Sequence, residues 1–267
     1  MQKIKSQSSS NNAIGVFDSG VGGTSIWKEI HSLLPNENSI YLADSKNAPY
    51  GIKSKADIIA LCEKNVELLL QDQCKIIIVA CNTATTIAIK HLRTKYAIPF
   101  IGIEPAIKPA SLKTKTKNIG ILATKGTLAS ELFQETTSIY SQGIEVLEQD
   151  GTGIVELIEN GKLYSIEMKI LLQEYLNPMI EAKIDHLVLG CSHYPYLIPI
   201  LKEILPKEVK IIDSGRAVAR QTKTVLEAGK LLNRSTKLPK LHFYTNGSKP
   251  LLESLIGSKF RVENKFF

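Results

Sequence analysis

Residues 76–86 read IIIVACNTATT, and residues 186–196, which lie 110 positions further along the chain, read HLVLGCSHYPY. Each stretch is a short, largely apolar run that ends at a cysteine and continues with polar side chains. Such a run, bounded by polar residues, is typical of a strand that is buried on both faces. The two stretches therefore predict two equivalent buried strands, each with a cysteine just beyond its carboxyl end.

Two more pairs of segments repeat at almost the same spacing. Residues 14–16 (IGV) resemble residues 119–121 (IGI), 105 positions on, and residues 98–106 (IPFIGIEPA) resemble residues 209–217 (VKIIDSGRA), 111 positions on. Three matches at nearly one spacing are typical of an internal duplication. We therefore expect two similar halves that face each other across a cleft.

From Ala13 onward, short β-branched runs alternate with amphipathic segments. The clearest helix pattern spans residues 54–71, where apolar side chains recur at steps of three and four and Ser54 with Asp57 offers an N-cap. Strands that alternate with helices predict an α/β fold with parallel sheets covered by helices. The expected strands are residues 13–17, 39–42, 75–79, 100–103, 118–122, 144–147, 186–189, 209–212 and 241–244.

The composition is that of a globular protein, because 43% of the 267 residues are hydrophobic and 22% are charged. This apolar content excludes disorder for most of the chain. The longest apolar stretch, residues 76–81, is six residues long, whereas a membrane span needs about 20, so no span is expected. Residues 1–12 are expected to be a polar, frayed tail, and they lack the apolar core of a secretory signal.

The charge balance and the cysteines narrow the function further. The net charge is +7, but the densest basic run, residues 108–117 (KPASLKTKTK), contains no aromatic side chain, so nucleic acid is not expected as a primary partner. The net positive charge instead favours small acidic molecules as ligands or substrates. Four cysteines without C-x-x-C spacing argue against a disulfide scaffold and a zinc ribbon, and they indicate a reducing, cytoplasmic compartment.

Cys81 and Cys191 are the residues that the repeat singles out, whereas Cys62 and Cys74 match ordinary core positions. Ligands of parallel α/β sheets bind beyond the carboxyl ends of the strands, next to helix N-termini. A helix N-terminus favours a thiolate, so we expect a lowered pKa for both thiols. The polar residues that follow them, Asn82–Thr83 and Ser192, are suited to holding a carboxylate.

Two thiols on opposite walls of one cleft suit inversion at a carbon that carries hydrogen. One group removes the proton from one face, and the other returns a proton to the opposite face. Because the product is the mirror image of the substrate, the two groups should be alike in kind and opposed in position. Two domains related by duplication provide this arrangement.

Other polar residues follow the remaining expected strands. Residues 18–24 (DSGVGGT) contain glycines that let a ligand approach the backbone, with Asp18 placed to orient Cys81 or accept a proton near it. The second half carries residues 124–127 (TKGT) at the same position, and residues 49–51 (PYG) follow the second strand. His193, two residues after the second cysteine, can tune that thiol.

A metal site is not expected. A set of metal ligands could come from His186, Cys191 and His193, but these residues lack a regular ligand spacing and His186 falls within a strand. The histidines other than His193, namely His31, His91, His186 and His242, are expected to be surface or packing residues.

With these residues assembled, the chain resembles the glutamate racemases of the cofactor-independent aspartate/glutamate racemase superfamily over about residues 14–265. The resemblance rests on IGVFDSGVGG from Ile14, YLADSKNAPYG from Tyr41, VACNTAT from Val79, Thr124 with Thr127, and LGCSHYP from Leu189. It implies interconversion of L- and D-glutamate without pyridoxal phosphate or metal, and a supply of D-glutamate for peptidoglycan. It also implies a homodimer.

The resemblance implies residue roles and a domain division. The first domain would comprise residues 1–104 and 214–267, and the second residues 105–213, related by a pseudo-twofold axis with the active site in the cleft between them. The implied catalytic residues are Cys81, Cys191, Asp18, His193 and Glu159. The implied substrate-binding residues are Ser19, Tyr50, Gly51, Asn82, Thr83, Thr124, Thr127 and Ser192, the last at a position where threonine is usual.

Three alternatives remain at this point. The same fold could racemise another amino acid such as aspartate. A cysteine hydrolase would use Cys191 as nucleophile and His193 as base, and it would leave Cys81 without a role. A two-domain binding protein would use both cysteines only as structural residues.

Overall fold

Ten strands form two separate parallel sheets in the computed structural model, which describes residues 9–267. The larger sheet has the order β10-β9-β2-β1-β3-β4, and the smaller one has the order β6-β5-β7-β8. The strands are β1 (Ile14–Asp18), β2 (Ser39–Ala43), β3 (Ile76–Val79), β4 (Phe100–Gly102), β5 (Asn118–Ala123), β6 (Glu145–Asp150), β7 (His186–Gly190), β8 (Lys210–Ile212), β9 (Leu241–Thr245) and β10 (Val262–Asn264).

The internal duplication is visible in the strand order. The segment β2-β1-β3-β4 of the larger sheet has the same arrangement as β6-β5-β7-β8 of the smaller sheet. Ile14 pairs with Ile76 in the first sheet, and Ile119 pairs with His186 in the second, so the segments that repeat in the sequence pair with each other in both sheets. The predicted α/β fold with two similar parallel-sheet domains is confirmed.

All nine expected strands are present, with ends that differ by one to three residues. The sequence analysis missed β10, which pairs with β9 at the edge of the larger sheet. This strand has three residues, Val-Glu-Asn, and two of them are exposed. So short a segment carries no apolar alternation from which a strand can be predicted.

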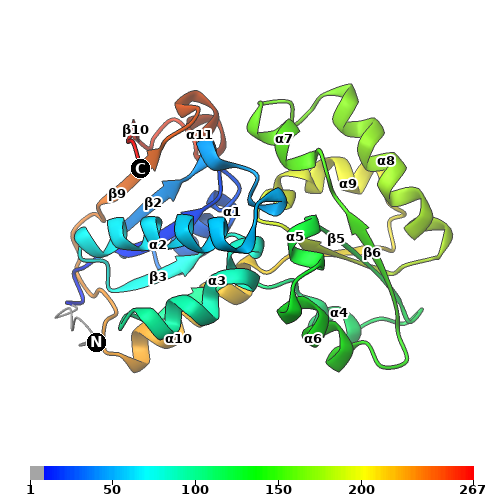
Figure 1. Cartoon of the computed structure of the whole chain (residues 1–267), viewed down its shortest axis with the longest axis horizontal. Coiled ribbons are helices and arrows are strands. Elements are labelled where there is room, and N and C mark those ends of the chain that lie inside the picture. The colour runs from blue at the N-terminus through cyan, green and yellow to red at the C-terminus, as the bar shows by residue number, and fades with distance from the viewer. Residues whose placement is uncertain (1–8) are drawn as a thin grey trace.

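Helices lie along both sheets, and Figure 1 shows the two units side by side. The predicted N-cap of α2 is confirmed, because the Ser54 side chain accepts a hydrogen bond from the backbone of Asp57. No helix within residues 9–267 combines the length and apolar character that a membrane crossing requires. The helices are α1 (Thr24–Leu33), α2 (Lys55–Gln71), α3 (Asn82–Lys95), α4 (Ile107–Ser111), α5 (Lys125–Leu128), α6 (Glu131–Tyr140), α7 (Ile154–Glu159), α8 (Ile166–Glu181), α9 (Ile198–Ile204), α10 (Gly215–Ala228) and α11 (Lys249–Ile256), with 3₁₀ turns η1 (Ser45–Asn47), η2 (Tyr50–Ile52) and η3 (Tyr194–Leu197).

The apolar run of β3 supplies the core on both sides of its sheet. Ile76 and Ile78 belong to the cluster that contains Trp27 of α1, whereas Ile77 and Val79 belong to the cluster that contains residues of α2 and α3. Successive side chains of a strand point to opposite faces, so a central strand covered on both faces is apolar at every position. This burial holds the end of β3, and with it Cys81, in place.

After the second sheet the chain returns to the first unit. Helix α10, which follows β8, packs against α1, and β9 pairs with β2. The division into residues 1–104 with 214–267 and residues 105–213 stays a proposal, which these contacts support.

The start of the described chain is better ordered than expected. Of the predicted frayed tail, residues 1–8 lie outside the described residues, but residues 9–12 form a turn in which the Asn12 N–H donates to the Ser9 carbonyl. The carbonyl of Ser10 accepts a hydrogen bond of 2.6 Å from the buried ammonium of Lys75. The prediction was therefore wrong for residues 9–12, because a buried charge needs these backbone partners.

Candidate active site

The loop after β1, residues 18–24, lies in close contact with the second unit. A Cβ at Gly20 would lie 1.9 Å from Glu159 Oε1, and a Cβ at Gly22 would lie 2.3 Å from His193 Nδ1. Only glycine at these positions lets the two side chains of the second unit reach the loop backbone. The glycines were predicted to admit a ligand, and the contact that demands them comes from Glu159 and His193.

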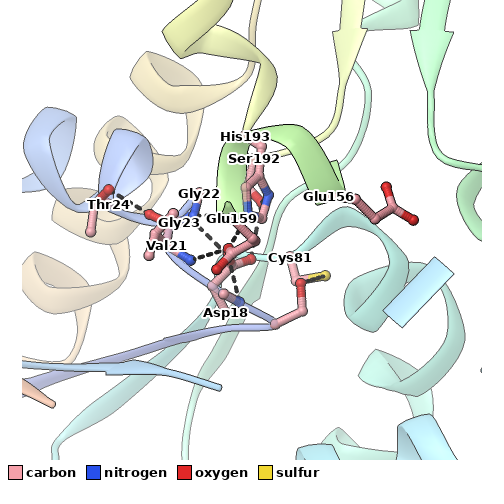
Figure 2. Close-up of polar contacts among 12 residues, drawn as sticks. Asp18, Val21, Gly22, Gly23, Thr24, Cys81, Glu156, Glu159, Ser192 and His193 are labelled. Carbon is pink, nitrogen blue, oxygen red and sulfur yellow. Dashed lines mark hydrogen bonds and ion pairs between the residues drawn. The ribbon is translucent and has the colours of Figure 1, made fainter. Parts of the chain in front are cut away.

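Glu159 and His193 form a pair against this loop, as Figure 2 shows. The Nε2 atom of His193 lies 2.6 Å from Glu159 Oε1, and the N–H of Val21 donates to the same oxygen at 2.7 Å. Burial by itself would lower the pKa of His193, but Cys191 and Glu159 outweigh it and hold that pKa well above its ordinary value. His193 is therefore positively charged at neutral pH, with Nδ1 3.8 Å from the sulfur of Cys191.

Asp18 is buried at the end of β1 and binds groups of both units. Its carboxylate accepts N–H groups from Gly20 at 3.1 Å and Gly23 at 3.0 Å, and the hydroxyl of Ser192 at 3.0 Å. Burial raises the pKa of Asp18 to about 6, although the nearby His193 charge acts in the opposite direction. Asp18 is therefore mostly ionised at neutral pH.

Cys81 caps the N-terminus of α3, where the N–H of Ala84 donates to its sulfur at 3.4 Å. Its thiol also donates to Ser19 Oγ at 3.5 Å. Burial, followed by the charge of Asp18, nevertheless raises the pKa of Cys81 to about 12. The predicted lowering of this pKa was wrong, because desolvation and a neighbouring carboxylate outweigh the hydrogen bonds at the helix end.

Cys191 occupies the matching position of the second unit with a different neighbourhood. It follows β7 and precedes the 3₁₀ turn η3 rather than an α-helix, so the expected helix N-terminus is absent there. Cys81 and Cys191 are only 5% and 7% exposed, and Asp18, which raises the pKa of Cys81, accepts a hydrogen bond from Ser192, the residue that follows Cys191. The structure thus brings together two buried thiols, one beside a carboxylate and one beside an imidazolium.

Three threonine hydroxyls meet at a second contact between the two units. Thr83 Oγ1 lies 2.9 Å from Thr124 Oγ1 and 3.4 Å from Thr127 Oγ1, and the latter two lie 3.0 Å apart. Gly51 and Gly126 lie against this cluster, because a Cβ at Gly126 would be 3.0 Å from both the Gly51 carbonyl oxygen and Thr83 Cγ2. Four predicted binding residues and the neighbouring Gly126 thus form one polar contact between the units.

Tyr50 is buried, and its hydroxyl donates to Asp44 Oδ2 at 2.6 Å. The amide of Asn65 approaches the same hydroxyl at 3.4 Å. The phenol of this predicted binding residue is thus hydrogen-bonded within the first unit, at the start of η2 and next to Gly51.

Asn82 differs from its neighbours in having no partner for its side chain. Both Nδ2 and Oδ1 are buried, and neither forms a hydrogen bond within residues 9–267. A buried polar group left unpaired costs about 1–3 kcal/mol. An amide that presents a donor and an acceptor beside Cys81 is suited to a ligand that carries both an ammonium and a carboxylate.

Sequence reasoning missed the contacts that hold the two units together near Asp18. The hydroxyls of Thr24 and Tyr196 lie 2.6 Å apart, and Ser25 Oγ donates to the carbonyl of Ser192 at 2.8 Å. All of these residues lie within or next to motifs that were singled out. Nothing in a single sequence, however, indicates that residues about 170 positions apart share a hydrogen bond.

No metal centre is apparent in the part of the chain that the structure describes. No group of three or more His, Cys, Asp or Glu side chains within residues 9–267 is arranged to hold an ion. His186 is buried in β7, and its Nδ1 lies 2.7 Å from Asp185 Oδ1 rather than near the site.

The sequence of the chain matches a family of known proteins. The model of the Asp/Glu/hydantoin racemase family matches residues 14–222. The chain belongs to this racemase family. A glutamate racemase of Herpetosiphon aurantiacus is 44% identical over 234 residues, which cover 88% of this chain and 92% of that relative.

Solved racemase structures share the fold over nearly the whole chain. Escherichia coli glutamate racemase, in complex with L-glutamate and the activator UDP-MurNAc-ala, matches with a TM-score of 0.83 and 31% identity, over 95% of this chain and 97% of that one. Glutamate racemase of Francisella tularensis, in complex with D-glutamate, matches with a TM-score of 0.82 and 30% identity, over 96% and 98%. An aspartate racemase of Picrophilus torridus is 17% identical with a TM-score of 0.51 and shares the fold alone.

Proposed function

We propose that this chain is a glutamate racemase that interconverts the two enantiomers by a two-base mechanism with Cys81 and Cys191. The observation that carries the proposal is the pair of buried thiols, one from each unit, each with its own ionisable neighbour. The family membership and the 44% identity to a glutamate racemase support glutamate as the substrate. The distant likeness to an aspartate racemase does not favour aspartate.

The proton moves between the α-carbon and the two sulfurs. One cysteine, as thiolate, takes the proton from the α-carbon and becomes a thiol, while the electron pair of the C–H bond moves into the carboxylate. The thiol of the other cysteine then donates its proton to the opposite face of that carbon and becomes a thiolate. The enzyme ends with the two protonation states exchanged, so the reverse direction uses the same residues in swapped roles.

Each thiol has ionisable neighbours that can assist its own proton transfer. We propose that Asp18 orients Cys81 and accepts a proton near it, and that His193, held by Glu159, exchanges a proton with Cys191. The charge of His193 offsets the negative charge that a thiolate brings into a buried site. Each thiol thus has an ionisable neighbour from its own unit, Asp18 for Cys81 and His193 for Cys191, so each face of the substrate has its own proton supply.

The substrate would be held by groups at the carboxyl ends of the strands. We propose that the Asn82 amide and the hydroxyls of Ser19 and Ser192 bind the α-ammonium and α-carboxylate, and that the cluster of Thr83, Thr124 and Thr127 with Gly51 binds the side-chain carboxylate. The unpartnered amide of Asn82 supports the first half of this assignment, and the shared hydroxyls of the cluster support the second.

The product is D-glutamate, and we propose that it supplies peptidoglycan synthesis in the cytoplasm and that the enzyme acts as a homodimer. The four cysteines, all free and buried, agree with a reducing compartment.

The decisive experiment is incubation of the purified protein with L-glutamate in deuterated water. We expect loss of optical rotation, deuterium at the α-carbon and no release of ammonia. A cysteine hydrolase or a binding protein would leave the rotation and the α-hydrogen unchanged. Loss of rotation with L-aspartate but not with L-glutamate would contradict the substrate assignment.

A further inference from the structure

A hollow of about 740 Å³ lies on the outer side of the contact between Gly51 and Gly126. Its walls come from η2 and the start of α2 in the first unit, from α3, and from α5 and the start of α6 in the second unit. The hollow is therefore shared by both units. The two glycines belong both to its lining and to the threonine cluster of the site.

Positive charge dominates this hollow. Its lining includes Lys53, Lys55, Lys90 and Lys125, whereas Glu131 is the one carboxylate among the lining residues. Lys90 lies 4.0 Å from Glu135 in an exposed pair, and the other three lysines form no ion pair within residues 9–267. A hollow lined by one sign of charge raises the local concentration of small ions of the opposite sign.

The two sides of the contact between the units differ in strength. On the side of Asp18, several hydrogen bonds cross it, including those from Ser192 to Asp18 and from Val21 to Glu159. On the side of the hollow, the units touch through two glycines, the threonine hydroxyls, the Leu132 side chain packed against the first unit, and the exposed Lys90–Glu135 pair. Because both proposed catalytic thiols are buried, a substrate must part the units somewhere, and fewer hydrogen bonds join the units on the side of the hollow.

We propose that the lysine-lined hollow is the access route to the active site and that its four lysines attract the α-amino dicarboxylate substrate from solution. This inference rests on the proposed function. Glutamate carries a net negative charge at neutral pH, so the lysines favour it both during approach and once it is bound. Access then requires a local separation of Gly51 from Gly126, while the polar contacts at Asp18 stay closed.

The test is the salt dependence of racemisation in a charge-neutralised variant. We expect the K53Q/K55Q/K90Q/K125Q variant to lose about 10-fold in kcat/KM at low salt, with kcat changed less than 2-fold. We also expect a flatter decline of kcat/KM with ionic strength than in the wild type. Racemisation has an equilibrium constant of one, so kcat/KM must fall equally with L- and D-glutamate, which checks the assay.

A matched control separates the hollow from net charge. The K113Q/K202Q/K207Q/K237Q variant removes four exposed lysines that do not line the hollow. An equal loss in the control, or an unchanged salt dependence in the first variant, would overturn the proposal. If the fourfold variant does not fold, K53Q and K125Q are measured as single variants. An unchanged kcat/KM in both of them would contradict the proposal. Absence of racemisation in the wild type would instead refute the proposed function.

Discussion

At the scale of single residues, the two cysteines carry the strongest prediction. Replacing Cys81 or Cys191 by serine removes the acid or base for one face of the substrate, so each variant should lose net racemisation by at least about 10²–10⁴-fold. Each should still exchange the α-hydrogen of one enantiomer with deuterated water, because the other thiol remains. Turnover and exchange are measured with both enantiomers. A variant that racemises both at the wild-type rate would refute the two-base mechanism.

The pKa of Asp18 predicts that kcat/KM depends on pH. Its pKa of about 6 means that the carboxylate beside Cys81 becomes protonated in mild acid. We expect kcat/KM to fall as the pH drops through about 6, and D18N to lack this step while its activity is lower at every pH. A D18N profile that keeps the same step would assign the titration to another group.

The raised pKa of Asp18 also makes the free energy of unfolding depend on pH. The pKa of Asp18 is raised on folding, so the folded state binds this proton more tightly than the unfolded chain does. Its contribution to the free energy of unfolding is therefore full below pH about 4 and is lost as the pH rises to about 6. Thermal unfolding of wild type and D18N, compared between pH 4 and 7, should show the wild type losing stability relative to the variant. A constant difference would contradict the assigned pKa.

At the scale of elements, the strands could be predicted well and the contacts between units could not. Runs such as residues 76–79 are apolar at every position because the strand is covered on both faces, and this property is local to the chain. The position of Cys81 at the strand end follows from it. Its pKa does not, because the burial and the Asp18 charge that set it come from distant segments. The role of Gly20 and Gly22 was missed for the same reason.

Gly22 provides a test at this scale. A Cβ there would lie 2.3 Å from Nδ1 and 2.6 Å from the backbone nitrogen of His193, so G22A must push this segment away from the loop. We expect racemisation to fall by about 100-fold, since a shift of about 1 Å has effects of that size. Exchange of the enantiomer that depends on Cys81 should be reduced less than that of the other.

The control for G22A is G229A, because a Cβ at the end of α10 meets its nearest atoms only at 3.3 Å. This variant should keep the wild-type rate. Equal losses of exchange with both enantiomers in G22A would show that the loop supports the whole site rather than His193 alone.

At the scale of the whole molecule, the proposed catalytic residues and the buried ion pair of Lys75 lie at opposite ends of the first sheet. The proposed catalytic residues Asp18 and Cys81 lie at the carboxyl ends of β1 and β3, whereas Lys75 precedes β3 at its amino end. Its buried ammonium contacts Glu37 Oε2 at 2.5 Å and the carbonyls of Ser10 and Leu231 at 2.6 and 2.8 Å. Lys75 thus joins two segments from the first third of the chain, at Ser10 and Glu37, to one from its last third, at Leu231, at the end of the sheet opposite to Cys81.

This separation predicts that K75M destabilises the protein without changing its chemistry. Removing one partner of a buried ion pair leaves Glu37 buried without its counter-charge, which costs about 3–5 kcal/mol. We therefore expect a large decrease in the melting temperature of K75M, with kcat at 25 °C within about 2-fold of wild type for the folded fraction. The double variant K75M/E37M should recover part of the loss, because it removes the uncompensated charge as well. A K75M variant that melts like the wild type, or that folds but loses kcat, would show that the two ends of the sheet are not independent.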